Sequence, residues 1–199
     1  MPTYQGMFAS GVGTPKFWRS QVLAPLIKTS NEKEDDDMSN ETTMKNLQKA
    51  LSMELSAMHQ YQLHAHTLDD WGLDKLAAQM REEMQEELGH SNEYMNRIMF
   101  LNGEPELEFY KKPVKAKSLE EMFKADLADE EEAIMFYTEA AMQAGEQADV
   151  GTRTLFEKIL LDEEGHKSWL ELQLSLLDRL GEKTFSSKYV SGTEQSGDA

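Results

Sequence analysis

Six acidic and histidine residues recur in this sequence at a fixed spacing. They are Glu54, Glu87, His90, Glu130, Glu163 and His166. In each half of the set, the second glutamate lies 33 residues after the first, and a histidine follows it three positions later. Two glutamates and two Glu-x-x-His sets on four helices are the ligand inventory of a carboxylate-bridged dimetal site in a four-helix bundle. The spacing therefore predicts a di-iron site.

The residue types explain why a metal is expected. Four glutamates on the inward faces of four helices would place four negative charges in one apolar core, and unpaired buried carboxylates are too costly for a fold to tolerate. Two divalent cations would neutralise them. Oxygen ligands with two imidazoles suit Fe, Mn or Zn. Glu87 and Glu163, each paired with a histidine on its own helix, are the natural bridging ligands, which makes Glu54 and Glu130 terminal.

Two tyrosines and three further histidines lie near these positions. Tyr61 and Tyr137 each follow a predicted ligand by seven residues on the same helix face, so their hydroxyls could bond a ligand carboxylate. The alternative is an aromatic core residue with a satisfied hydroxyl. His59, His64 and His66 lack partners at ligand spacing, so we interpret them as surface or packing residues.

Four long helices must position the ligands. Apolar periodicity predicts helices over about 40–70 and 73–101, a third that begins at the capping box of Ser118 and Glu121, and a fourth that Asp149 caps and Gly181 ends. Residues 103–117 contain two prolines and no helical period, so they form a connection that can span about 50 Å. One long link between short ones makes the second and third helices parallel. The expected fold is therefore all-α, a ferritin-like four-helix bundle with a long crossover, followed by a short helix within 183–190.

Composition limits the other possibilities. The net charge of −17 makes nucleic acid an improbable partner, because an acidic protein does not neutralise phosphates. The sequence has no cysteine, which excludes disulfides and thiolate metal sites, and no apolar run long enough to span a membrane. A reducing cytosol is the expected compartment.

The chain divides into three parts. Residues 1–37 form an N-terminal extension, 38–182 the bundle, and 183–199 a short C-terminal helix with a flexible tail. Residues 1–31 carry basic residues and no acid, and an acidic run follows them. A flexible tail, a targeting segment and a start codon set too early (Met38 would open a compact domain) all fit this pattern.

Several stretches of the chain resemble bacterioferritin. They read MELSAMHQYQLHAHTLDDWGLDKLA, EELGHSNEYMNRIMFLNGEP, LEEMFKADLADEE and LFEKILLDEEGHKSWLE, and the resemblance covers roughly 45–181 with every predicted ligand. It implies a hollow shell of 24 subunits, a ferroxidase centre with two Fe ions in each bundle, and storage of oxidised iron as mineral. It also implies terminal Glu54 and Glu130, bridging Glu87 and Glu163, and one histidine nitrogen for each iron.

The sequence departs from the family at the haem site. The family's haem is ligated by a methionine directly after the second-helix glutamate ligand, and this chain has Leu88 there. Leucine has no lone pair to offer iron, so haem is not expected in the homo-oligomer. A mixed shell with a Met-bearing partner subunit would still bind it.

Three functional hypotheses follow. The first is an iron-storage ferroxidase that oxidises Fe(II) with O2 or hydrogen peroxide. The second is a di-iron oxidoreductase that acts on peroxide or an organic substrate. The third is a non-catalytic shell subunit, which the intact ligand set disfavours. The first is our prediction, with Tyr61 as a supporting residue.

Overall fold

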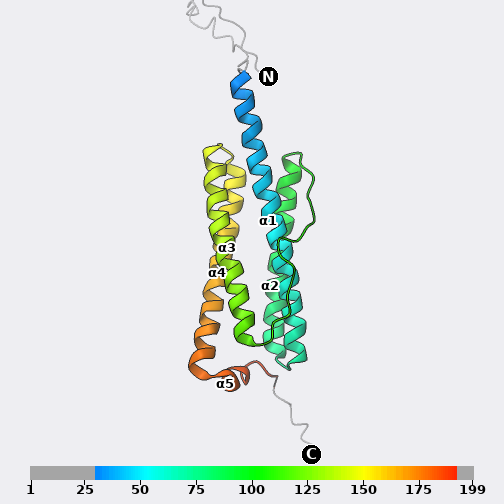
Figure 1. The fold of residues 1–199 in the computed structure, drawn as a ribbon, viewed down its shortest axis with the longest axis vertical. Coiled ribbons are helices and arrows are strands. Elements are labelled where there is room, and N and C mark those ends of the chain that lie inside the picture. The colour runs from blue at the N-terminus through cyan, green and yellow to red at the C-terminus, as the bar shows by residue number, and fades with distance from the viewer. Residues whose placement is uncertain (1–29, 192–199) are drawn as a thin grey trace, which may run out of the picture.

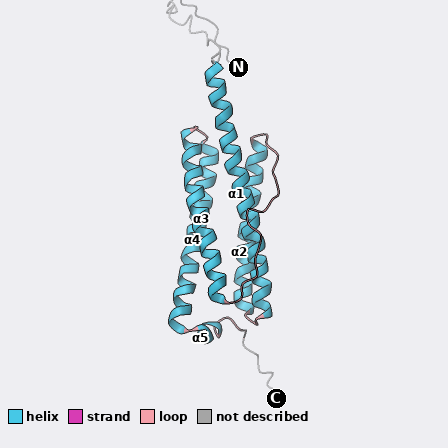
Figure 2. Ribbon diagram, viewed as in Figure 1, coloured by secondary structure: helices cyan, strands magenta, loops and turns pink. Residues whose placement is uncertain are grey.

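The computed structural model describes residues 30–191, and every regular element in that range is a helix (Figure 2). The five helices are α1 (Ser30–Asp70), α2 (Asp74–Phe100), α3 (Leu119–Glu146), α4 (Val150–Leu180) and α5 (Glu182–Ser186). The four long helices lie side by side as a bundle, and the short α5 crosses one end of it (Figure 1).

The connections have the predicted topology. α1 packs against α2, and α3 packs against α4, each pair joined by a tight turn. The segment between α2 and α3 returns along the length of the bundle, so that these two helices run in the same direction (Figure 1). This segment, the crossover, confirms the ferritin-like topology.

A polar stripe on α1 holds the crossover in place. Gln48, Ser52, Ser56 and Gln60 are spaced four residues apart on one face of the helix. The Gln60 amide bonds both backbone groups of Val114, at 2.8 and 2.9 Å. Gln48 likewise bonds the backbone of 104 and 106. The Ser52 carbonyl accepts from the backbone amide of 110, and the Ser56 hydroxyl accepts from that of 111. The position of the crossover is therefore set by hydrogen bonds from α1 to the crossover backbone.

The predicted helix boundaries hold at most ends. Ser118 caps α3 by accepting a hydrogen bond from the Glu121 amide at 3.1 Å, and Asp149 caps α4 by accepting one from Thr152 at 3.0 Å. Gly181 ends α4 with a φ of +72°, a conformation that glycine adopts without strain.

Two boundaries differ from the prediction. α1 begins at Ser30 and not near residue 40. The acidic run at residues 32–37, which we interpreted as a linker, lies within this helix. α5 ends at Ser186, so it is shorter than the helix predicted within 183–190.

Two apolar clusters fill the bundle, and each long helix contributes to both. The cluster nearer α5 contains Leu68, Met80, Phe123 and Leu170, and the other contains Leu51, Ile98, Tyr137 and Phe156. On every helix the predicted ligands fall between its contributions to the two clusters. The polar site is consequently enclosed by apolar packing along the bundle axis.

No helix in the described range is long and apolar enough to cross a membrane. Residues 1–29 and 192–199 lie outside the described residues. The division into an extension, a bundle and a tail therefore stays a prediction.

Candidate metal centre

The six predicted ligands come together in the interior of the bundle. Each has at most 8% of its surface exposed. They are Glu54 from α1, Glu87 and His90 from α2, Glu130 from α3, and Glu163 and His166 from α4. Each stands on the inward stripe of its helix, where the 3.6-residue period otherwise places apolar side chains.

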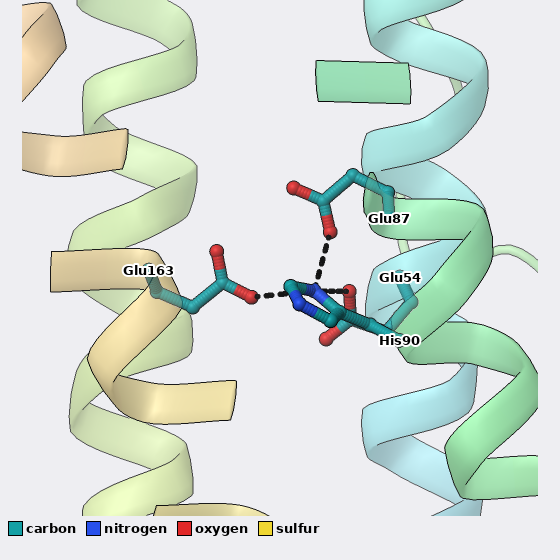
Figure 3. A group of neighbouring side chains, drawn as sticks. All are labelled: Glu54, Glu87, His90 and Glu163. Carbon is teal, nitrogen blue, oxygen red and sulfur yellow. Dashed lines mark hydrogen bonds and ion pairs between the residues drawn. The ribbon is translucent and has the colours of Figure 1, made fainter. Parts of the chain in front are cut away.

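The six side chains form two overlapping groups of potential ligands. One contains Glu54, Glu87, His90 and Glu163, whose side chains converge from three helices (Figure 3). The other contains Glu87, Glu130, Glu163 and His166. Within each group the ligand atoms lie within 4.8 Å of one another. Glu87 and Glu163 belong to both groups, which is the arrangement that two bridging carboxylates require.

Burial and mutual repulsion dominate the electrostatics of the carboxylates. Burial raises the pKa of Glu87 and of Glu130 well above the usual range, and the neighbouring Glu163 raises both further. Burial would also raise the pKa of Glu163, but hydrogen bonds from His166 and His90 outweigh it and lower that pKa to about 2. Burial and mutual repulsion thus both oppose negative charge on Glu87 and Glu130.

Burial has the opposite effect on the pKa of the histidines, but their carboxylate neighbours outweigh it. Burial lowers the pKa of His166, but its hydrogen bond to Glu163, 2.8 Å long, outweighs burial and raises the pKa to about 9. Contacts with Glu163, Glu54 and Glu87 likewise raise the pKa of His90. Both imidazoles must lose a proton before they can ligate a metal, so protons and metal ions compete for these sites.

Two tyrosines hold predicted ligand carboxylates across the bundle. The Tyr61 hydroxyl on α1 donates to Glu130 on α3 at 2.5 Å, and the Tyr137 hydroxyl on α3 donates to Glu54 on α1. Both tyrosines are also buried in the apolar clusters, so each is a core aromatic residue whose hydroxyl is satisfied by a predicted ligand. Each tyrosine donates to the glutamate on the opposite helix, so the two hydrogen bonds connect α1 with α3 at the site.

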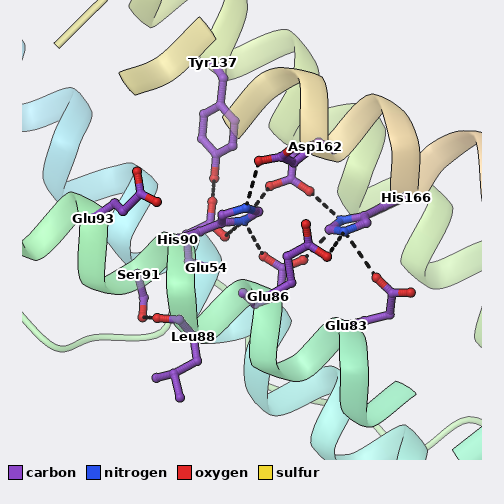
Figure 4. Close-up of polar contacts among 12 residues, drawn as sticks. Glu54, Glu83, Glu86, Leu88, His90, Ser91, Glu93, Tyr137, Asp162 and His166 are labelled. Atoms are coloured by element: carbon purple, nitrogen blue, oxygen red, sulfur yellow. Dashed lines mark hydrogen bonds and ion pairs between the residues drawn. The ribbon is translucent and has the colours of Figure 1, made fainter. Parts of the chain in front are cut away.

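Three carboxylates that sequence reasoning missed contact the outward nitrogens of the histidines (Figure 4). His90 Nε2 lies 3.4 Å from Asp162 of α4, and His166 Nε2 lies 3.2 Å from Glu83 and 3.5 Å from Glu86 of α2. Each histidine thus faces acids from the opposite helix. Carboxylates in this position fix the tautomer and orientation of a metal-binding imidazole.

One atom at the centre tests whether the residues suit a metal. Glu87 Oε1 is buried and lacks a well-formed hydrogen bond to any residue in the described range. Buried polar atoms are rarely left in this state, because each forfeits its interaction with water. Four buried carboxylates with two imidazoles, and a shared carboxylate with an orphaned oxygen, fit a pair of divalent cations.

The remaining histidines are not part of the centre. His66 is exposed, and His59 bonds the Leu55 carbonyl at 2.8 Å. His64 is fully buried and lies 3.1 Å from Asp126. The acid partner of His64 is 62 residues away in sequence, so no local spacing could have identified it.

Leu88 points away from the six ligands, on the outer face of α2 (Figure 4). Its side chain is partly exposed, at 37%. A residue here belongs to the surface of the subunit and does not reach the buried centre.

Comparison with known proteins gives a consistent set of relatives. A family described as the ferritin-like domain matches residues 44–180. Bacterioferritin from Rhodobacter capsulatus is 41% identical over 140 residues, which cover 70% of this chain and 87% of that protein. Bacterioferritin BfrA from Mycobacterium tuberculosis is 38% identical over 145 residues, with coverages of 73% and 91%.

Solved structures agree. The chain superposes on Rhodobacter capsulatus bacterioferritin, a structure with a metal-free dinuclear site and haem iron, with a TM-score of 0.74 and 38% identity. The match covers 76% of this chain and 95% of that one. The structure of Mycobacterium tuberculosis BfrA gives a TM-score of 0.73 at 37% identity.

Proposed function

The chain belongs to the ferritin-like family and, within it, to the bacterioferritins, and from this premise we propose that it is an iron-storage ferroxidase. Its substrates are Fe(II) and either O2 or hydrogen peroxide. Two iron ions at the centre would supply the chemistry, each giving up one electron to the oxidant. The ferric product is then stored as mineral inside an oligomeric shell.

One observation carries this proposal, namely that the two ligand groups share two residues. Because Glu87 and Glu163 belong to both groups, we assign them as bridging ligands. Glu54 and Glu130 are then terminal ligands, and His90 and His166 each contribute Nδ1, the nitrogen that faces the carboxylates. Two metals held this close can accept electrons from or deliver them to one small molecule together.

The surrounding residues hold this arrangement from outside the six ligands. Tyr61 and Tyr137 fix the terminal carboxylates, and Asp162 and Glu83 orient the imidazole rings. The two apolar clusters limit water along the bundle axis, which strengthens the electrostatic interactions within the site.

The alternative, an oxidoreductase for peroxide or an organic substrate, is not favoured. The match covers most of the length of these bacterioferritins. The intact set of six ligands also counts against a purely structural shell subunit.

Membership of the bacterioferritins implies an oligomeric shell. We propose that this shell contains 24 subunits and that it is located in the cytosol. Light scattering of the purified protein tests the assembly, since a stable monomer or dimer at micromolar concentration contradicts it. Cell fractionation tests the location.

The reaction is tested by removing one terminal ligand. Glu130→Ala should abolish fast Fe(II) oxidation while the shell still assembles. Glu131→Ala is the matched control, because Glu131 is the exposed neighbour and contacts Lys167 at the surface. Oxidation that is equally fast in both variants would contradict the assignment.

A further inference from the structure

A pocket joins the metal centre to the protein surface beside the crossover. Its inner wall contains Glu54 and Glu130, together with the shared ligands Glu87 and Glu163. Its outer wall contains Tyr110 and Lys111 of the crossover and two acids of α3. The pocket therefore passes between α1 and α3 and opens where the crossover lies over them.

A lysine closes the outer end of this pocket. The Lys111 ammonium lies 2.5 Å from Asp129 and 2.7 Å from Glu132, and the Tyr110 hydroxyl donates to Glu132 at 2.5 Å. The acids precede and follow the ligand Glu130 on α3 by one and two residues. A positive charge thus occupies the position between two carboxylates at the mouth of the route to the centre.

The lysine side chain is not needed to hold the crossover. The polar stripe of α1 already fixes the backbone on both sides of Lys111, and Ser56 accepts from the Lys111 amide at 3.1 Å. Lys111, Asp129 and Ser56 also border a second pocket, which leaves the ammonium space to move aside. Lys111 is 47% exposed, and ion pairs this exposed are weak.

The interior of the pocket has side chains suited to binding a cation. Glu87 Oε1, the buried oxygen without a well-formed hydrogen bond among the described residues, belongs to a residue that lines it. Carboxylates line it from the mouth to the centre, and within this lining Lys111 is the only cationic residue. A divalent cation that passes Lys111 therefore has carboxylates beside it on its way inward.

We propose that Asp129 and Glu132 form the uptake site for Fe(II) and that Lys111 is the stand-in cation that Fe(II) displaces. This inference rests on the proposed function and adds a route to the centre. The step is an ion exchange in which no covalent bond changes. The Lys111 ammonium keeps its protons as it moves away from the two carboxylates. A divalent cation, with twice the charge, takes its place.

The structure supports an exchange and not a proton transfer. Burial lowers the pKa of Lys111, but the hydrogen bonds to Asp129 and Glu132 outweigh it and raise the pKa above its ordinary value. The ammonium therefore keeps its charge at neutral pH. A +2 ion between two carboxylates gains more attraction than a +1 ion at the same distance.

The rate of metal uptake tests the proposal without any oxidation. The apo-protein in its assembled form is mixed anaerobically with Co(II), and the visible absorption of Co(II) in the centre is followed by stopped flow. Lys111→Gln should accelerate uptake by about 2- to 30-fold, the factor for two exposed ion pairs of ordinary strength. Lys111→Arg keeps the charge and should remain near the wild-type rate.

Two further variants make the comparison specific. Lys112→Gln removes the same charge from the adjacent residue, whose ammonium makes no ion pair within the described range, so it should change the rate little. Asp129→Asn combined with Glu132→Gln should slow uptake below the wild-type rate. All variants should still bind two Co(II) per subunit at equilibrium.

The outcomes separate the route from the centre. Equal rates for Lys111→Gln and Lys112→Gln, with two Co(II) bound, would overturn the uptake route and leave the metal centre standing. No Co(II) bound by the wild-type protein would overturn the metal centre, and the route with it.

Discussion

The two tyrosines offer a quantitative test of how the centre is held. Tyr61 and Tyr137 are 3% and 1% exposed, and each hydroxyl donates to a terminal carboxylate. Replacing either by phenylalanine deletes one hydroxyl and keeps the ring in its apolar cluster. A hydrogen bond to a charged group contributes about 1.5–3 kcal/mol. Loss of such an outer partner lowers metal affinity by about 10- to 100-fold, or about 1.4–2.8 kcal/mol, and the two ranges agree.

The assay is competition between the apo-protein and a chelator for Zn(II) or Co(II). Tyr61→Phe and Tyr137→Phe should each weaken metal binding by about 10- to 100-fold. Tyr94→Phe is the control, because Tyr94 is a fully buried tyrosine whose hydroxyl makes no hydrogen bond to any of the six predicted ligands. Its loss should leave metal affinity within about twofold of the wild type. Undiminished affinity in Tyr61→Phe would show that the hydroxyl is only a satisfied core group.

Three other predictions concern the rest of the subunit. The homo-oligomer reconstituted with haem should lack the spectrum of bis-methionine ligation, and Leu88→Met should introduce it; a wild-type homo-oligomer with that spectrum would contradict this reasoning. Deletion of residues 1–37 should leave the shell assembled and Fe(II) oxidation unchanged, whereas a collapsed or inactive product would show that the segment is essential. Asp149→Ala should cost about 0.5–2 kcal/mol at neutral pH, measured as a lower thermal midpoint. Burial raises the pKa of Asp149, but bonds from Thr152 and the charge of Arg97 outweigh it, so the folded pKa lies below the unfolded one. The contribution of this cap is therefore present above the unfolded pKa and lost as the pH falls through the folded pKa, and an equal effect of the variant well below pH 3.8 would contradict it.

The sequence was sufficient to predict the topology and the six residues that the bundle brings together. The ligands could be found because a carboxylate at a core position breaks the apolar period of its helix, and because the same break occurs twice at one spacing. The crossover could be found because residues 103–117 are too long and too irregular for a tight turn. These signals are local, or they repeat along the chain.

The partners across the bundle could not be predicted in the same way. Tyr61 donates to Glu130, and Asp162 faces His90 and not the histidine of its own helix. These pairings depend on how the helices are rotated against one another. Glu83 lies four residues before Glu87 on the same face, which is the one sequence signal that could have pointed to it. The acidic run at residues 32–37 was misleading, because a charge run of this kind predicts a linker but here lies within α1.

The position of Lys111 could not be predicted for a related reason. It lies in a segment without periodicity, so its side-chain direction follows from the backbone bonds to the polar stripe of α1. That stripe has four-residue spacing and was visible in the sequence, but it carried no sign of what it would bind.

The central claim is that these six residues hold two iron ions between four helices. Crystals of the assembled protein loaded anaerobically with Fe(II) and measured at the iron absorption edge test it most directly. Two anomalous peaks are expected in each subunit, both about 2.0–2.2 Å from oxygens of Glu87 and Glu163, with one histidine nitrogen beside each. A single peak, or iron bound only outside the six residues, would contradict it.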